Sequence, residues 1–112
     1  MDRMFNFLQD IDNYDDRCIG RYPPEGDFLV DTAAVSDGRL PYETAIKHPE
    51  YNDGNMIIVE AYPNKEGAQA GHEKWIKTMI TEPLPEVLVD CKNAELMSLY
   101  DEELSYPRVK IN

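Results

Sequence analysis

The sequence predicts an α+β fold, a small antiparallel sheet with a central hairpin and one main helix packed on one face. Two strand-like segments, 42–48 and 56–62, flank an Asp-Gly dipeptide. A helical pattern follows, from Asn64 to the prolines that begin at position 83. Because an amphipathic helix and a half-apolar sheet each need to bury one face, we expect them to pack against each other.

The hairpin is the clearest local pattern. Residues 56–62 are rich in β-branched and aromatic types, which favours a central strand. Residues 53–54 are Asp-Gly with Asn on either side, a combination typical of a tight reversal. The segment 28–35 is also strand-like and precedes a breaker, so it predicts a further strand. Residues 42–48 alternate in the strand manner, and one face carries Tyr42, Thr44 and Ile46.

The helix carries one of the two histidines. Asn64 is suited to the N-cap, and Glu66 places an acid in the first turn, where the helix dipole favours it. His72 lies on the apolar stripe, so we interpret it as a packed side chain with one satisfied hydrogen bond. Gly71 beside it is expected to let the helix approach a strand closely. The stripe recurs at helical spacing and comprises Ala68, His72, Trp75, Ile76, Met79 and Ile80.

The remaining segments complete a single domain. Residues 86–91 alternate and predict a short strand, whereas 93–104 have a helical rhythm. The last seven residues, beginning at Tyr106, are expected to be extended. We therefore divide the chain into an N-terminal arm or short helix, 1–16, and one α+β domain, 17–112.

Composition narrows the classes of partner. The 112 residues include 22 acidic and 11 basic ones, a net charge of −11, and 42% are hydrophobic. This charge opposes direct binding to nucleic acid or to an anionic membrane. Cys18 and Cys91 lie far apart without a CxxC spacing, which favours a reducing compartment over a disulfide framework. The N-terminus does not resemble a signal peptide, so the expected location is the cytoplasm.

The sequence contains no recognisable catalytic or metal-binding motif. An EF-hand comparison starting at Asp10 fails, because Asp15 stands at the glycine position and Arg21 at the bidentate glutamate position. There is no GxSxG motif and no phosphate-binding glycine loop. A zinc site would have to draw single ligands from separate elements, unlike the close pairs typical of structural zinc: Cys18, His48, His72 and Cys91. We therefore expect that the protein is not an enzyme and that it binds neither a cofactor nor a metal ion.

The stretch YETAIKHPEYNDGNMIIVEAYPNKEGAQAGHEKWIKTM resembles a segment of small uncharacterised proteins of tailed bacteriophages and prophages. Those proteins have two short strands followed by an N-capped helix with a Gly-His pair, and the resemblance covers roughly residues 28–91. Gly67 departs from it, since an acidic residue is common there. The matching positions are Glu43, Thr44, Ala45, Ile58, Val59, Glu60, Ala68, Gly71, His72, Trp75 and Ile76.

The resemblance implies a phage accessory protein without enzymatic activity, and it transfers no catalytic residue. We expect a virion structural or assembly component, such as a capsid, connector or tail accessory, located in the host cytoplasm and incorporated into the virion. Its partners would be phage structural proteins or further copies of itself. The expected interaction residues are apolar ones near the N-terminus and acids after the helix: Phe5, Phe7, Leu8, Ile11, Glu82, Glu86 and Asp90.

The acidic C-terminal third leaves an alternative function open. A surface of carboxylates can imitate nucleic acid and occupy the binding groove of a host defence nuclease or another nucleic-acid-binding enzyme. Such an inhibitor would bind tightly to a basic partner, and salt would weaken that binding. The acids concerned are Glu82, Glu86, Asp90, Glu95, Asp101, Glu102 and Glu103.

Overall fold

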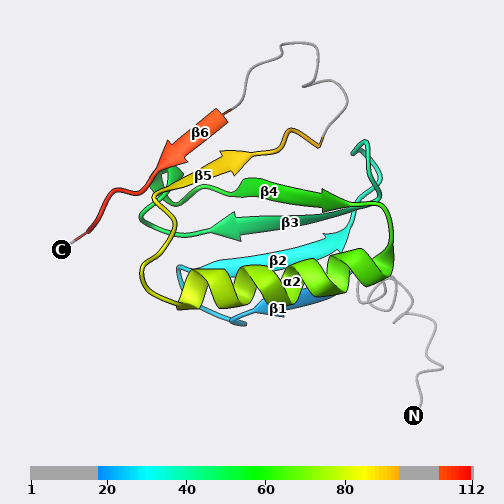
Figure 1. Ribbon diagram of the computed structural model, residues 1–112, viewed down its shortest axis with the longest axis horizontal. Helices are drawn as coiled ribbons and strands as arrows, with labels where there is room; N and C mark the ends of the chain where they lie inside the picture. Colours follow the sequence, from blue (N-terminus) through cyan, green and yellow to red (C-terminus); the bar gives the residue numbers. More distant parts are fainter. Residues whose placement is uncertain (1–17, 94–103, 112) are drawn as a thin grey trace, which may run out of the picture.

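The computed structural model describes residues 18–93 and 104–111 (Figure 1). The expected arm at 1–16 and nearly all of the expected helical segment at 93–104 lie outside these residues. The elements in chain order are β1 (Cys18–Tyr22), β2 (Leu29–Ala34), β3 (Tyr42–Lys47), the 3₁₀ turn η2 (Asn52–Gly54), β4 (Ile57–Tyr62), α2 (Lys65–Ile80), β5 (Val87–Asp90) and β6 (Leu104–Pro107).

The first four strands form an antiparallel sheet in the order β1-β2-β3-β4. Thr32 of β2 pairs with Thr44 of β3, so residues of the same type face each other in the middle of the sheet. β5 and β6 form a second, two-stranded antiparallel sheet. β5 lies beside β4, and the Cys91 N–H donates a hydrogen bond to the Ile58 carbonyl at 2.7 Å. The arrows of β4 and β5 point the same way, with α2 as the crossover between them (Figure 1).

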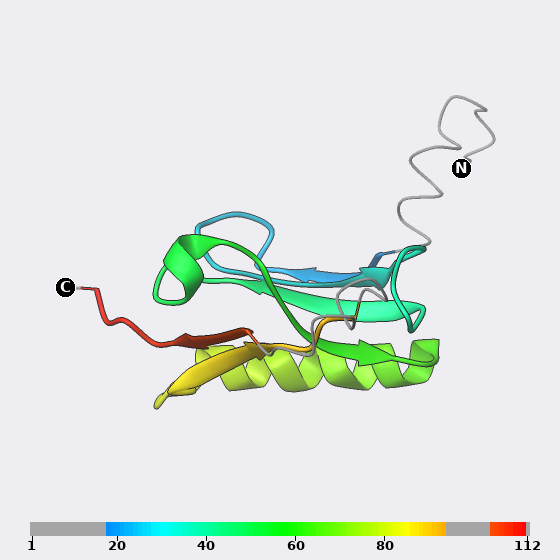
Figure 2. The same ribbon diagram turned by 90° about the horizontal axis from the view of Figure 1, so that it is seen from above.

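Helix α2 covers one face of the four-stranded sheet and contacts all four strands (Figure 2). The α+β prediction is thereby confirmed, with a hairpin from β3 and β4 and one main helix on one face. The Asn64 side chain accepts a hydrogen bond from the Gly67 N–H at 2.8 Å, which confirms the N-cap. No helix in the described ranges is long and apolar enough to cross a membrane.

The core lies between α2, the helix-facing side of the sheet and the β5–β6 hairpin. Tyr51, in the loop between β3 and β4, is fully buried and closes one end of this core. Its hydroxyl donates a hydrogen bond to the Pro85 carbonyl at 2.5 Å, which ties the loop to the segment before β5. The buried cluster consists of Val30, Ile46, Tyr51, Ile57, Met79 and Leu88.

Three expectations need correction. β4 is the last strand of the four-stranded sheet and not a central one. β5, which lies beyond it, belongs to the second sheet and is joined to β4 by the Cys91–Ile58 backbone hydrogen bond. The β3–β4 connection is longer than a two-residue turn: it makes a 3₁₀ turn in which Asn52, Asp53 and Gly54 have positive φ. Ile80, assigned to the buried stripe, is 56% exposed, because it is the last helical residue and lies past the core.

Candidate functional site

A chain of hydrogen-bonded side chains lies between α2 and the sheet. Strand alternation turns Thr32 and Thr44 toward the helix, and both are fully buried. Their hydroxyl oxygens are 2.6 Å apart. Thr32 Oγ1 lies 2.7 Å from His72 Nδ1 on the helix, and Thr44 Oγ1 lies 2.8 Å from the Tyr62 hydroxyl at the end of β4. The chain thus runs from helix to sheet and across three neighbouring strands.

Two glycines leave the space that this chain occupies. A Cβ atom on Gly20 of β1 would lie 2.3 Å from His72 Nε2. A Cβ atom on Gly71 of α2 would lie 2.2 Å from the Tyr62 hydroxyl oxygen. Real Cβ atoms do not approach other atoms so closely, so both rings depend on the absence of a side chain. The expected role of Gly71 in a close helix–strand approach is confirmed.

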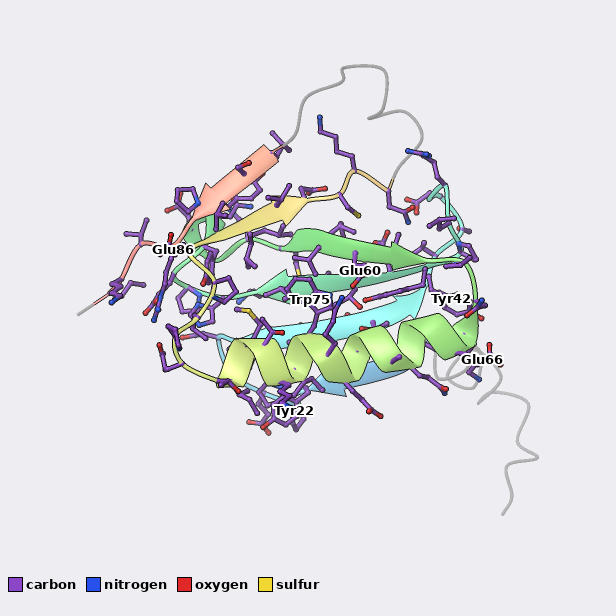
Figure 3. The ribbon with its side chains drawn as sticks, in the orientation of Figure 1. Tyr22, Tyr42, Glu60, Glu66, Trp75 and Glu86 are labelled. Atoms are coloured by element: carbon purple, nitrogen blue, oxygen red, sulfur yellow. The ribbon has the colours of Figure 1, made fainter. Side chains whose placement is uncertain are left out.

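Glu60 of β4 lies at the other end of this chain of hydrogen bonds, next to Tyr62. Its Oε1 accepts hydrogen bonds from Lys74 Nζ at 2.6 Å, from Trp75 Nε1 at 2.8 Å and from the Tyr62 hydroxyl at 3.3 Å. Figure 3 shows the Glu60 and Trp75 side chains close together above the helix. The Lys74 ammonium also lies 5.3 Å from the centre of the Trp75 ring, within range of a cation–π interaction.

Three side chains of this hydrogen-bond chain have shifted pKa values. Burial lowers the pKa of His72, against opposing contributions from Asp31 and Glu73, so the imidazole is neutral at pH 7. Burial is also the largest cause that raises the pKa of Tyr62 to about 12. Burial acts to raise the pKa of Glu60, but the hydrogen bonds from Lys74 and Trp75 outweigh it, so the net pKa is lowered.

The second histidine has a different setting. His48 follows β3, with ring centres 5.6 Å from Phe28 and 5.3 Å from Tyr51 in edge-on contacts. Its Nδ1 accepts a hydrogen bond from the Glu50 N–H at 3.0 Å, and burial lowers its pKa. Within residues 18–93 and 104–111, no three His, Cys, Asp or Glu side chains are grouped to hold a metal ion.

A clamp around Arg108 fastens the C-terminal segment to the domain. Arg108 Nε lies 2.5 Å from Glu50 Oε1, and one terminal nitrogen lies 3.5 Å from Glu82 Oε2. The Arg108 N–H donates to the Glu86 carbonyl at 2.8 Å, and the Val109 N–H donates to the Glu50 carbonyl at 2.8 Å. The guanidinium therefore links the β3–β4 loop to the segment between α2 and β5.

The outer face of the β5–β6 hairpin is mainly apolar, with Ser105 as a polar residue opposite Val89. Leu88 pairs with Tyr106 and is buried, so its neighbours Val87 and Pro107, which also pair, point outward. Val87 is 43% exposed, and beyond β6 Val109 is 65% exposed. We use the name hairpin strip for the apolar residues of this face together with two exposed apolar residues of the segment that follows β6: Val87, Val89, Pro107, Val109 and Ile111.

Two of the predicted acids lie beside the hairpin strip. Glu86 directly precedes β5 and is exposed at the base of the hairpin (Figure 3). Glu82 is exposed and shares Arg108 with Glu50. Asp90 lies apart, at the far end of β5, where its Oδ1 accepts a hydrogen bond from the Lys92 N–H at 2.8 Å. The predicted apolar residues lie outside the described part of the chain: Phe5, Phe7, Leu8 and Ile11.

The negative charge is unevenly divided along the chain. The described ranges contain thirteen acidic and nine basic residues, whereas the rest of the sequence contains nine acidic residues and two basic ones. Several of the described acids are also paired with cations, as Asp31 is with Arg21 at 3.8 Å. The described domain therefore carries only a modest acidic excess.

Sequence reasoning missed Glu60 and Arg108 as the centres of two polar clusters. Both residues lie in segments of ordinary strand or extended character, and their partners come from distant positions, so no local spacing identifies them. The one available signal for Glu60 is its position on the inward face of an otherwise apolar strand. No protein-family model, curated protein sequence or solved structure matches this chain.

Proposed function

We propose that this chain is a non-enzymatic protein–protein interaction protein, a phage virion or assembly component that docks through the hairpin strip. The observation that carries the proposal is the exposure of three apolar side chains at the start of β5 and in the segment after β6: Val87, Val109 and Ile111. An exposed apolar patch with a polar rim is typical of a protein-binding surface. The phage setting rests on the sequence resemblance.

The chemistry of the partner follows from the rim. The exposed carboxylates of Glu82 and Glu86 lie at the base of the strip, and within the described residues Glu82 is the one of the two that forms an ion pair, with Arg108. A partner with an apolar centre and a basic edge would complement this surface. We therefore expect a phage structural protein with lysine or arginine residues around an apolar contact.

Contacts with the core and the neighbouring loops hold the hairpin strip in place. Such a surface can bind a partner with a small loss of conformational entropy. Leu88 is buried against the core, and the Arg108 clamp holds the segment that follows β6. The bond from Tyr51 to the Pro85 carbonyl holds the segment that precedes β5. A surface already fixed in its bound form loses little conformational freedom on association.

One experiment distinguishes the assembly proposal from the acidic-inhibitor alternative. The experiment is mass spectrometry of purified phage particles produced from a genome that encodes this chain. Stoichiometric presence in the particle supports an assembly component. Absence from both particles and assembly intermediates contradicts it and favours the inhibitor.

A further inference from the structure

We propose that the carboxylate of Glu60 imposes one direction on the buried hydrogen-bond chain and thereby fixes His72 as the Nδ1–H tautomer, with an unprotonated Nε2 facing β1. This goes beyond the proposed function and does not depend on it. The inference rests on counting hydrogen-bond donors along five linked side chains, each of which has a limited number of protons to donate.

The direction is set at the Glu60 end. An ionised carboxylate only accepts hydrogen bonds, so the proton between Glu60 Oε1 and the Tyr62 oxygen belongs to the tyrosine. If the Tyr62 proton pointed elsewhere, its oxygen lone pairs would face a charged carboxylate at 3.3 Å. The indole N–H of Trp75 and the Lys74 ammonium hold the carboxylate in place. Tyr62 therefore donates to Glu60.

The donor and acceptor roles of the remaining hydroxyl groups then follow one by one. Because Tyr62 has used its proton, its oxygen accepts from Thr44, whose oxygen lies 2.8 Å away. Thr44 in turn has no proton left for Thr32, so Thr32 donates to Thr44 across 2.6 Å. The Thr32 oxygen must then accept at its 2.7 Å contact with His72 Nδ1, which requires a proton on that nitrogen.

The surroundings of the other ring nitrogen agree with this tautomer. His72 Nε2 lies over Gly20, at 2.3 Å from the position of a Cβ atom. The hydrogen bond that joins this ring to the sheet runs through the other nitrogen, Nδ1. With the direction derived above, a proton on Nε2 in place of Nδ1 would leave the Thr32 oxygen facing an unprotonated nitrogen at 2.7 Å.

His48 is an internal reference with the opposite tautomer. Its Nδ1 accepts from the Glu50 N–H at 3.0 Å, so neutral His48 carries its proton on Nε2. The two histidines of the chain should therefore differ in the same spectrum. They are the only two in the sequence, so one variant, His48→Gln, assigns both signals.

The experiment is a long-range ¹H–¹⁵N correlation spectrum of the full, ¹⁵N-labelled chain, recorded well above the ordinary histidine pKa of about 6.5. We expect a protonated Nδ1 and an unprotonated Nε2 in His72, and the reverse pattern in His48. Tyr62→Phe removes the link to Glu60, so His72 should lose the pure Nδ1–H pattern. Tyr106→Phe, which changes a tyrosine outside the chain of hydrogen bonds, should leave it unchanged.

Two results would overturn the proposal. One is an Nε2–H tautomer of His72 in the wild-type protein, which would mean that the chain runs in the opposite direction. The other is a folded Tyr62→Phe variant that retains the pure Nδ1–H pattern, which would mean that Glu60 does not set it. The wild-type spectrum tests the tautomer without any variant, and the folded Tyr62→Phe variant tests the part played by Glu60.

Discussion

Replacing Gly71 by alanine should destabilise the protein, although alanine is the better helix former. The new Cβ atom would lie 2.2 Å from the Tyr62 hydroxyl oxygen and 2.3 Å from two carbons of the same ring. Tyr62 cannot move freely, because it is 5% exposed and its hydroxyl bonds Thr44 and Glu60. Either the ring or the helix must shift.

The expected magnitude follows from three contributions. Helix propensity stabilises the alanine variant by about 1 kcal/mol. Overpacking of the contact with Tyr62 costs about 1–3 kcal/mol. Displacing the tyrosine hydroxyl from Thr44 leaves a buried polar group unsatisfied, at about 1–3 kcal/mol. The net loss in the free energy of unfolding is therefore about 3 kcal/mol, within a range of about 1–5 kcal/mol.

The matched control lies one turn earlier in α2. A Cβ atom on Gly67 would lie 3.2 Å from Asn64 Oδ1 and 3.6 Å from Tyr62 Cβ, so it needs only a small adjustment. Gly67→Ala should therefore be neutral, or more stable by up to about 1 kcal/mol. Urea denaturation followed by far-UV circular dichroism measures both variants. Equal stability of Gly71→Ala and Gly67→Ala would refute the close approach between α2 and Tyr62.

Three further predictions concern the same polar groups. Because burial lowers the pKa of His72 and His48 in the folded state, the unfolded chain binds more protons just below pH 6.5. Urea titrations at several pH values should therefore show the histidine contribution to stability fully present above about pH 6.5 and lost as the pH drops toward the folded pKa values. Constant stability across this window would contradict neutral, buried imidazoles. Trp75→Phe removes a hydrogen bond to Glu60 and should cost about 1 kcal/mol in the same assay, whereas no loss would assign the indole N–H to solvent. Arg108→Gln should speed hydrogen exchange at the Val109 amide, and unchanged exchange there would argue against the clamp.

The segments with local patterns were predictable from the sequence. The alternation of 42–48, the N-cap at Asn64 and the apolar stripe of α2 each depend on residues a few positions apart. Their burial in the structure follows the same pattern, with Thr44, Ile46, Ala68 and Met79 all buried. The expected packing of His72 against the sheet follows from the same periodicity, and its bond to Thr32 agrees with it.

The long-range features were not predictable in the same way. β1 contains Gly20 and follows no clear alternation, and it becomes a strand because it pairs with β2 and lies beneath His72. Arg108 joins Glu50 and Glu82 across separations of 58 and 26 residues. Contacts of this kind depend on the assembled fold, because neither partner leaves a signal near the other in the sequence.

Docking through the hairpin strip, and not chemistry in the buried polar chain, is the function proposed for this protein. The most direct measurement compares incorporation into purified phage particles for the wild type, for Val87→Ser with Val109→Ser, and for Met56→Ser. Met56 is a suitable control, since it is 43% exposed, as Val87 is, and lies outside the strip. We expect the double variant to fold but to be lost from particles, and Met56→Ser to be incorporated as the wild type is. Full incorporation of a folded double variant would show that the strip does not carry the function.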